Sequence, residues 1–141
     1  MGKMRLFLDT NVIVDFLGER HPFYQDAASV LELMHKKKVS LSVSVLTLVN
    51  SAYVLRKAYS KDVMEDKIKW LCDTFDITPI DKEIIVDAIR HHGKDFEDTV
   101  QYYSAMTYNP DVILTRDKKG FSDLDIPVMT PAEFLERSRR Q

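Results

Sequence analysis

Short apolar runs alternate along the chain with longer segments in which apolar residues recur every three or four positions. The run from Met4 to Leu8 is typical of a buried strand, and further strands are predicted over 39–45, 77–80, 111–115 and 126–129. Helical spacing predicts helices over about 12–17, 21–38, 46–59, 64–75, 82–92 and 95–108, with a last one starting at Pro131. Strands that alternate with helices indicate βαβ units. The pattern therefore predicts an α/β fold with a mostly parallel sheet and helices on both faces.

Three of these helices carry further local signals. The helix over 46–59 is apolar on nearly every side, which predicts that it is buried. Asp81 can cap the helix that follows it, and Gly93 is placed to end that helix. The segment from Thr130 to Glu133 has the layout of a capping box, with proline at the first helical position.

Length and composition bound the class of protein. The 141 residues suffice for a single domain over residues 1–141, and 45% hydrophobic with 30% charged residues fits a folded core. The four glycines lie far apart, which excludes Walker-type and Rossmann-type phosphate loops. Because the net charge is -2, overall basicity gives no argument for nucleic-acid binding. The positions of the acids therefore matter more than their number.

The lone cysteine and the N-terminal segment bear on where the protein acts. Cys72 cannot form an internal disulfide, and its spacing between Trp70 and Phe75 predicts a small buried core residue. The apolar run that starts at Met4 is too short for a signal peptide or a membrane span. We therefore expect a reducing, cytoplasmic location without membrane contact.

Three aspartates stand where parallel α/β sheets bind ligands, outside the carboxyl ends of the strands. Asp9 directly follows the first strand, and Asp117 lies two residues past the strand over 111–115. Asp98 lies in the first turn of a helix that Asp95 can cap. If the first and fourth strands are neighbours, Asp9 and Asp117 face each other across the end of the sheet, and Asp98 can reach the same pocket.

Clustered carboxylates repel one another unless they are protonated or a cation neutralises them. Oxygen ligands without Cys or His partners favour Mg²⁺ or Mn²⁺ over Zn²⁺. Such an ion can activate water and stabilise the leaving oxygen in phosphodiester cleavage, which indicates a metal-dependent nuclease or phosphotransfer site. Each aspartate also has a structural interpretation, as a helix cap or a turn residue, so the residues alone leave both interpretations open.

Three blocks of sequence carry a family resemblance. They are Leu8-Asp9-Thr10-Asn11-Val12, Glu97-Asp98-Thr99-Val100-Gln101-Tyr102-Tyr103-Ser104-Ala105 and Val112-Ile113-Leu114-Thr115-Arg116-Asp117. In this order and spacing the blocks resemble the acidic motifs of PIN domains, the family that includes the VapC-like toxins of bacterial toxin–antitoxin pairs. The resemblance extends from about Met4 to Pro131.

The resemblance implies a three-layer α/β/α sandwich and Mg²⁺- or Mn²⁺-dependent endoribonuclease activity. Toxin members dimerise and are silenced by an antitoxin whose tail enters the active-site groove, so RNA, an antitoxin and a second copy are the expected partners. The residues that match the family's metal ligands are Asp9, Asp98 and Asp117. The residues that resemble supporting groups are Thr115, Asn11 and Asp95, with Glu97 as an alternative to Asp95.

The resemblance has one departure, in the predicted helix over 46–59. The family's second acid follows a Ser-x-x-Thr-like start, but here the start at Ser44 and Thr47 leads to Asn50. Asn50 can offer a carbonyl oxygen to a metal or its water, but it removes one negative charge. We interpret Asn50 as a working catalytic residue. The alternative is a catalytically weakened or inactive domain that still binds RNA or a protein partner.

Arg116, Lys118 and Lys119 flank Asp117 and are candidates for binding RNA phosphates, although a solvated loop explains them equally well. A further alternative is a receiver-like domain that uses Asp9 as a phospho-acceptor. Lys118 and Lys119 are poorly placed for the lysine that such a domain needs, and the segment after the first strand lacks the Asp-x-Asp of one phosphatase class. A ribonuclease is therefore the leading hypothesis.

Overall fold

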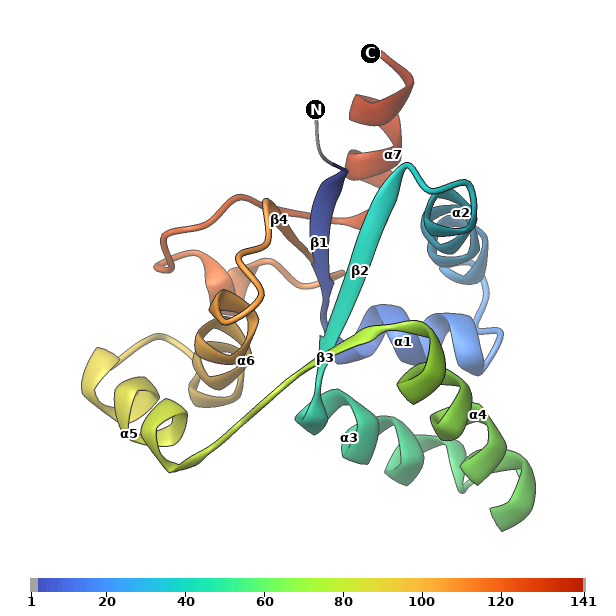
Figure 1. Cartoon of the computed structure of the whole chain (residues 1–141), viewed down its shortest axis with the longest axis horizontal. Helices are drawn as coiled ribbons and strands as arrows, with labels where there is room; N and C mark the ends of the chain where they lie inside the picture. The colour runs from blue at the N-terminus through green and yellow to red at the C-terminus, as the bar shows by residue number, and fades with distance from the viewer. Residues whose placement is uncertain (1–2, 141) are drawn as a thin grey trace.

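The chain folds into a central parallel sheet with helices on both faces (Figure 1). This computed structural model describes residues 3–140. Within them the strands are β1 (Met4–Leu8), β2 (Val39–Ser44), β3 (Asp76–Thr78), β4 (Val112–Leu114) and β5 (Val128–Met129). Their order is β3-β2-β1-β4-β5, and each neighbouring pair is parallel. The α/β prediction with a parallel sheet between two helical layers is confirmed.

Short polar side chains set where most of the helices begin. The helices are α1 (Thr10–Leu17), α2 (Tyr24–His35), α3 (Val45–Leu55), α4 (Lys61–Thr74), α5 (Lys82–His91), α6 (Phe96–Met106) and α7 (Pro131–Arg139). The side chains that accept a backbone N–H at these starts are those of Asp9, Ser44, Ser60, Asp81, Asp95 and Thr130. The capping box between Thr130 and Glu133 is confirmed, with both of its hydrogen bonds present.

Alternating side chains along the central strands divide the core into two parts. Leu6 and Leu8 of β1 pack with buried residues of α1, α2 and α7 on one face of the sheet. Phe7, between them, points to the other face and packs with Ala105 of α6 and with Phe121. Because β1 and β4 are buried on both faces, the residues that follow them are held in fixed positions at the edge of the sheet.

Helix α3 corrects one prediction. Its apolar sequence predicts a buried helix, but Val49 and Tyr53 are 68% and 55% exposed, and only Thr47, Ser51 and Leu55 are buried. The helix starts directly after β2 and packs beside α1 and α4, beyond the end of the sheet (Figure 1). Among the residues that the structure describes, only one side of α3 therefore has neighbours. Hydropathy alone does not reveal how many sides of a helix are covered.

The prediction of a buried cysteine is also wrong. Cys72 is exposed on α4, although Leu71 beside it is completely buried. Adjacent helix positions point about 100° apart, so one residue can face the core while the next faces solvent.

Helix α5 ends at a residue other than the predicted glycine. The left-handed conformation at its C-terminus belongs to His92, with φ 51° and ψ 44°, and Gly93 does not have a positive φ. A Cβ atom at Gly93 would collide with Thr99 Oγ1, so the glycine permits close approach to α6 instead. The positive φ of His92 is a strained choice for a residue with a side chain.

We expect His92→Gly to stabilise the protein by about 0.5–1 kcal/mol, because glycine adopts the left-handed conformation without steric cost. Urea unfolding followed by circular dichroism measures the change. Arg90→Gly is the matched control, since Arg90 is exposed within α5 and glycine in a helix costs about 1 kcal/mol. A loss of stability in both variants would contradict the expectation.

Candidate active site

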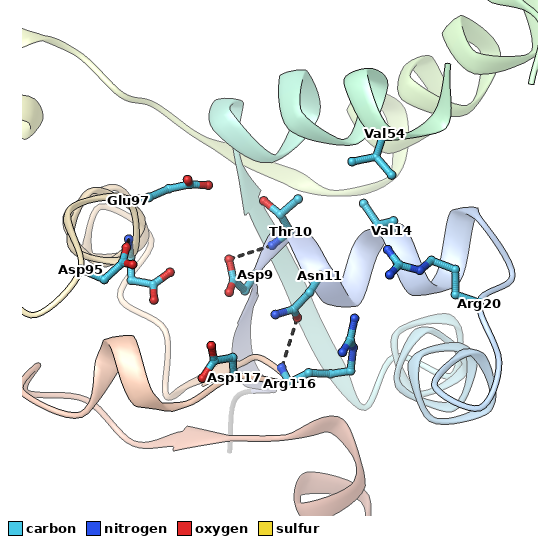
Figure 2. Close-up of a pocket in the computed structure, with 11 residues that line it drawn as sticks. Asp9, Thr10, Asn11, Val14, Arg20, Val54, Asp95, Glu97, Arg116 and Asp117 are labelled. Carbon is cyan, nitrogen blue, oxygen red and sulfur yellow. Dashed lines mark hydrogen bonds between the residues drawn. The ribbon is translucent and has the colours of Figure 1, made fainter. Parts of the chain in front are cut away.

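The carboxyl ends of β1 and β4 border a cavity of about 450 Å³ (Figure 2). Because β1 and β4 are parallel neighbours, residues 9 and 117 lie at the same edge of the sheet. The lining residues are Asp9, Thr10, Asn11, Val14, Arg20, Val54, Asp95, Glu97, Asp98, Arg116 and Asp117. The structure thus brings the three aspartates proposed as metal ligands to one place, together with Asp95 and Asn11.

Asp9 is the most deeply placed of these acids, with only 9% of the residue exposed. Its backbone N–H donates to the Leu114 carbonyl oxygen at 2.9 Å, which continues the pairing of β1 with β4. Its Oδ1 accepts from the Thr10 N–H at 2.8 Å, and its Oδ2 accepts from Thr115 Oγ1 at 2.9 Å. Asp9 therefore caps α1 and lines the cavity at the same time.

A buried glutamine holds Asp9 from the other side. Gln101 of α6 is completely buried, and its Nε2 donates to Asp9 Oδ1 at 3.2 Å and to Thr47 Oγ1 at 3.0 Å. Its Oε1 accepts from Ser44 Oγ. Gln101 therefore joins α6 to the start of α1, to α3 and to the end of β2. Its position one helical turn after Asp98 is the sequence signal that would have found it.

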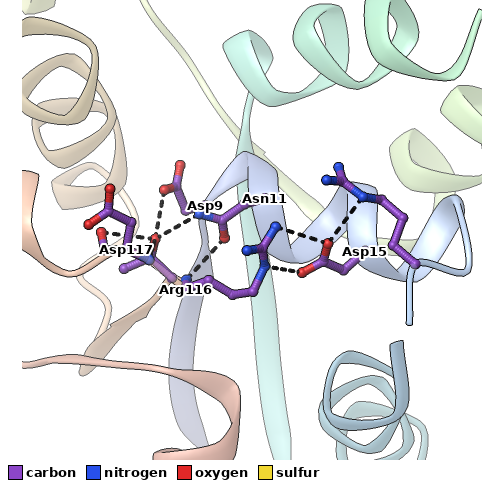
Figure 3. Close-up of polar contacts among 7 residues, drawn as sticks. Asp9, Asn11, Asp15, Arg116 and Asp117 are labelled. Atoms are coloured by element: carbon purple, nitrogen blue, oxygen red, sulfur yellow. Dashed lines mark hydrogen bonds and ion pairs between the residues drawn. The ribbon is translucent and has the colours of Figure 1, made fainter. Parts of the chain in front are cut away.

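Thr115 and Asn11 connect Asp9 with the loop that carries Asp117 (Figure 3). Thr115 Oγ1 accepts from Asn11 Nδ2 at 3.1 Å and from the Asp117 N–H at 3.2 Å. Asn11 Oδ1 accepts from the Arg116 N–H at 3.1 Å. These contacts fix the backbone from 115 to 117 against α1, and both side chains proposed as supports occupy positions suited to that role.

The first turn of α6 supplies the remaining acids. Asp95 caps the helix, and its Oδ1 accepts from the Asp98 N–H at 2.9 Å. Asp98 lies directly against Gly120 in the 3-10 turn over Lys119–Phe121, where a Cβ atom at residue 120 would overlap Asp98 Oδ2. Gly120 thus provides the space for this carboxylate. Reasoning from the sequence missed its role because the two residues are far apart in the chain.

Burial and mutual repulsion disfavour the charged state of two of these acids. Burial raises the pKa of the Asp9 carboxyl, an effect opposed by its hydrogen bonds from Thr115, Thr10 and Gln101. Burial, followed by repulsion from Asp9 and other nearby acids, raises the pKa of Asp98 to about 7. A bound cation would relieve both effects, since it stabilises the ionised carboxylates.

The donor set fits a hard divalent cation. Within residues 3–140, no three Asp, Glu, His or Cys side chains already converge at metal-binding spacing, so a cation would have to draw the carboxylates inward. The acids around the cavity nevertheless supply only oxygen ligands, which suit Mg²⁺ or Mn²⁺. The half-buried Asp98 carboxylate is attached through rotatable bonds, so it can make this movement.

Basic residues lie on the opposite side of the cavity from the acids. Arg116 Nε contacts Asp15 Oδ2 at 2.5 Å (Figure 3). The Arg116 guanidinium also lies 4.0 Å from the centre of the Phe23 ring. Arg20 Nε lies 3.7 Å from Asp15 Oδ1, and half of the Arg20 side chain is exposed. Asp15 itself is buried. Sequence reasoning missed Arg20, which follows α1 without any motif.

The two lysines proposed for RNA binding lie outside the cavity lining. Lys118 Nζ forms an ion pair with Glu133 Oε1 at 2.9 Å, between two exposed side chains. The Lys119 backbone N–H donates to Asp117 Oδ1 at 3.2 Å, so this residue helps to orient Asp117. An exposed ion pair contributes little free energy, so an approaching phosphate can compete for Lys118.

Asn50 lies beside the site rather than in it. It lines a neighbouring hollow of about 280 Å³, and its Nδ2 donates to Glu97 Oε1 at 3.0 Å. Glu97 lines both this hollow and the cavity that contains Asp9. The contact of Asn50 with the acids is therefore through Glu97.

Comparison with known proteins agrees with the fold and the order of the motifs. A family model described as PIN domain matches residues 5–119, and ribonuclease VapC1 of Aquifex aeolicus (strain VF5) is 33% identical over 97% of each chain. This chain therefore belongs to the PIN domain family.

Solved structures share the fold at lower identity. A toxin–antitoxin complex from Klebsiella pneumoniae contains a chain that superposes with a TM-score of 0.67 at 21% identity, over 89% of this chain and 97% of that one. VapC20 of Mycobacterium tuberculosis, a toxin that cleaves the sarcin–ricin loop, superposes with a TM-score of 0.66 at 13% identity, over 86% and 95%.

The raised pKa of Asp98 predicts how stability depends on pH. Its folded-state pKa of about 7 lies above the usual 3.8, so the stabilising protonated form is lost as pH rises through 7. We expect Asp98→Asn to stabilise metal-free protein at pH 8 by roughly 1 kcal/mol, a value reduced for solvent screening of a half-buried group. This corresponds to a midpoint about 3–5 °C higher in thermal unfolding with a chelator present.

The gain from Asp98→Asn should shrink at pH 5, where wild-type Asp98 already carries its proton in the folded state. Asp62→Asn is the matched control, because Asp62 is an exposed acid in the first turn of α4. An equal gain for Asp98→Asn at both pH values would contradict the assigned cause.

Proposed function

We propose that this protein is a metal-dependent endoribonuclease that hydrolyses RNA phosphodiester bonds, with the whole chain acting as one PIN domain. The observation that supports this proposal most directly is the buried Asp9 carboxylate, which lines the same cavity as Asp98 and Asp117. Membership of the PIN domain family and the similarity to a ribonuclease VapC1 support RNA as the substrate. Hard oxygen donors support Mg²⁺ or Mn²⁺ as the cofactor.

In this proposal Asp9, Asp98 and Asp117 hold the metal ion, which supplies an activated water and positive charge near the leaving oxygen. Thr115 and Gln101 hold the Asp9 carboxylate through hydrogen bonds, so it does not turn away from the cavity. These bonds also reduce the cost of keeping that carboxylate ionised without water.

The polarity of the cavity fits a phosphodiester. Acids line one side and Arg20 and Arg116 line the other, so a phosphate can bind a metal ion and a guanidinium together (Figure 2). Arg20 is the better placed donor, since Arg116 already makes two contacts with Asp15. Lys118 and Lys119 are proposed to contact phosphates further along the RNA strand.

The proposed partners are an antitoxin and a second copy of the chain. Structural relatives include the Klebsiella pneumoniae toxin–antitoxin complex and VapBC2 from Rickettsia felis bound to promoter DNA. Exposed apolar side chains at Val49 and Tyr53 of α3 offer area that a partner can cover. In residues 3–140, no helix combines the length and apolar character needed to cross a membrane. An RNA substrate is consistent with action in the cytoplasm.

The second candidate function is a binding module without catalysis. It is favoured by the uncharged Asn50, which stands where the PIN resemblance calls for an acid. Such a module would bind RNA or protein and would leave RNA intact even with Mn²⁺ at millimolar concentration. Cleavage of RNA by the purified protein in the presence of Mn²⁺ therefore separates a nuclease from a binding module.

Purified protein should cleave RNA with Mg²⁺ or Mn²⁺ and lose this activity when the metal is chelated. Asp9→Asn and Asp117→Asn should each lower the cleavage rate by about 100-fold or more, because each removes a ligand charge. Gel analysis of a labelled RNA measures the rate. Equal rates in wild type and both variants would exclude the proposed site, and Asp87→Asn, exposed on α5, serves as a control.

Gly120→Ala should lower the cleavage rate by about tenfold, because the added methyl group displaces the Asp98 carboxylate from its position. Thermal unfolding should remain close to wild type, since the obstructing oxygen lies at the end of a rotatable side chain. Ser122→Ala, an exposed change in the same loop, should leave the rate unaltered. A Gly120→Ala protein with full activity would show that the position of Asp98 is not critical.

A further inference from the structure

Glu97 is the one cavity acid tied to Asn50. Its Oε1 accepts from Asn50 Nδ2 at 3.0 Å, across 47 residues of sequence and between two different helices. Figure 2 shows Glu97 extending from α6 toward the space beside Asp9 and Thr10. Only Oε1 takes part in the contact with Asn50, so Oε2 can accept a second interaction.

We propose that Glu97 supplies the fourth carboxylate of the metal site and that Asn50 is a positioning residue that holds it there. The inference rests on the proposed metal-dependent function and deepens it. The negative charge that α3 lacks at residue 50 is supplied by α6 instead. Five acids line the cavity, and because Asp95 caps α6 through Oδ1, the four proposed to hold a cation are Asp9, Asp98, Asp117 and Glu97.

The amide at residue 50 follows from the chemistry of this contact. A carboxylate at residue 50 would face Glu97 at hydrogen-bonding distance without a proton to share, and the two charges would repel each other. An amide supplies an N–H donor and no charge, so it can hold the Glu97 carboxylate by a hydrogen bond without repelling it. Residues 50 and 97 are thus complementary as one amide and one acid.

Glu97 must be distinguished from an ordinary acid at a helix start, which interacts favourably with the helix dipole. Helix α5 provides the comparison, because it also has an aspartate cap followed two positions later by Glu83. Glu83 lines neither hollow that Glu97 lines. Any effect of the helix dipole should be shared by the two glutamates, whereas an effect on metal binding should belong to Glu97 alone.

The experiment is a calorimetric titration of metal-free protein with Mn²⁺. Glu97→Gln should raise the dissociation constant about tenfold or more, and Asn50→Leu should raise it by a smaller factor, because Glu97 loses its donor. Glu83→Gln should remain within about twofold of wild type. Asp9→Asn should remove the binding, which identifies the site being measured.

A charge exchange tests the coupling of the two positions. Asn50→Glu combined with Glu97→Gln returns the acid to α3, on a side chain one methylene group longer than asparagine that can extend toward the cavity, and should recover most of the affinity that Glu97→Gln loses. Failure of the double variant to bind better than Glu97→Gln would overturn the pairing. Wild-type affinity in Glu97→Gln, or absence of Asp9-dependent Mn²⁺ binding in wild type, would overturn the role of Glu97.

The titration also separates this inference from the ribonuclease proposal. Intact Mn²⁺ binding that depends on Asp9 and Glu97, without cleavage of RNA, would reject the ribonuclease and support the role of Glu97. Cleavage that persists while Glu97→Gln binds Mn²⁺ normally would reject only the role of Glu97.

Discussion

The buried carboxylate of Asp9 is the interaction on which the arrangement of the site depends. A carboxylate removed from water needs hydrogen-bond donors or a cation, and here three different segments supply the donors. The Thr10 N–H comes from α1, the Thr115 hydroxyl follows β4, and the Gln101 amide comes from α6. The hydrogen bonds to the Asp9 carboxylate therefore fix the relative positions of the elements that carry the other acids.

The same arrangement makes the ionised form of Asp98 unfavourable in the metal-free protein. Burial, followed by repulsion from several nearby acids, raises the pKa of Asp98 to about 7. A chain selected only for stability would remove such a carboxylate, whereas a cation-binding site needs it. Gly120 also serves this carboxylate, because a residue with a Cβ atom at position 120 would overlap Asp98 Oδ2. Several groups thus serve the cavity rather than the fold.

Local features of the fold could be predicted from the sequence. The alternation of apolar runs gave the strands near their observed positions, and the caps at Asp81, Asp95 and Thr130 depend only on nearby backbone. Part of the site could also be predicted. Ligands bind outside the carboxyl ends of parallel strands, and this rule places Asp9 and Asp117 at one edge of the sheet. The resemblance to PIN domains predicted that Asp98 is a metal ligand.

Features that depend on neighbours from distant segments were beyond the sequence pattern. The exposure of Val49 on α3 depends on what packs beside the helix, and its hydropathy does not reveal this. The contact between Asn50 and Glu97 is of this kind. In the sequence, Asn50 reads only as a position that lacks an acid, and Glu97 reads only as an acid in the first turn of a helix. Only their distance in the folded chain shows them as a pair.

The sequence by itself determined the succession of strands and helices, the capped helix starts at Asp81, Asp95 and Thr130, and the acids available at the strand ends, because these follow from residue periodicity and local hydrogen bonds. The tertiary structure alone decided which acid is buried, which side chains hold it, and where Asn50, Arg20 and Gly120 act. The physical reason is that desolvation and charge–charge repulsion depend on distances through space, and those distances are set when the helices pack around the sheet.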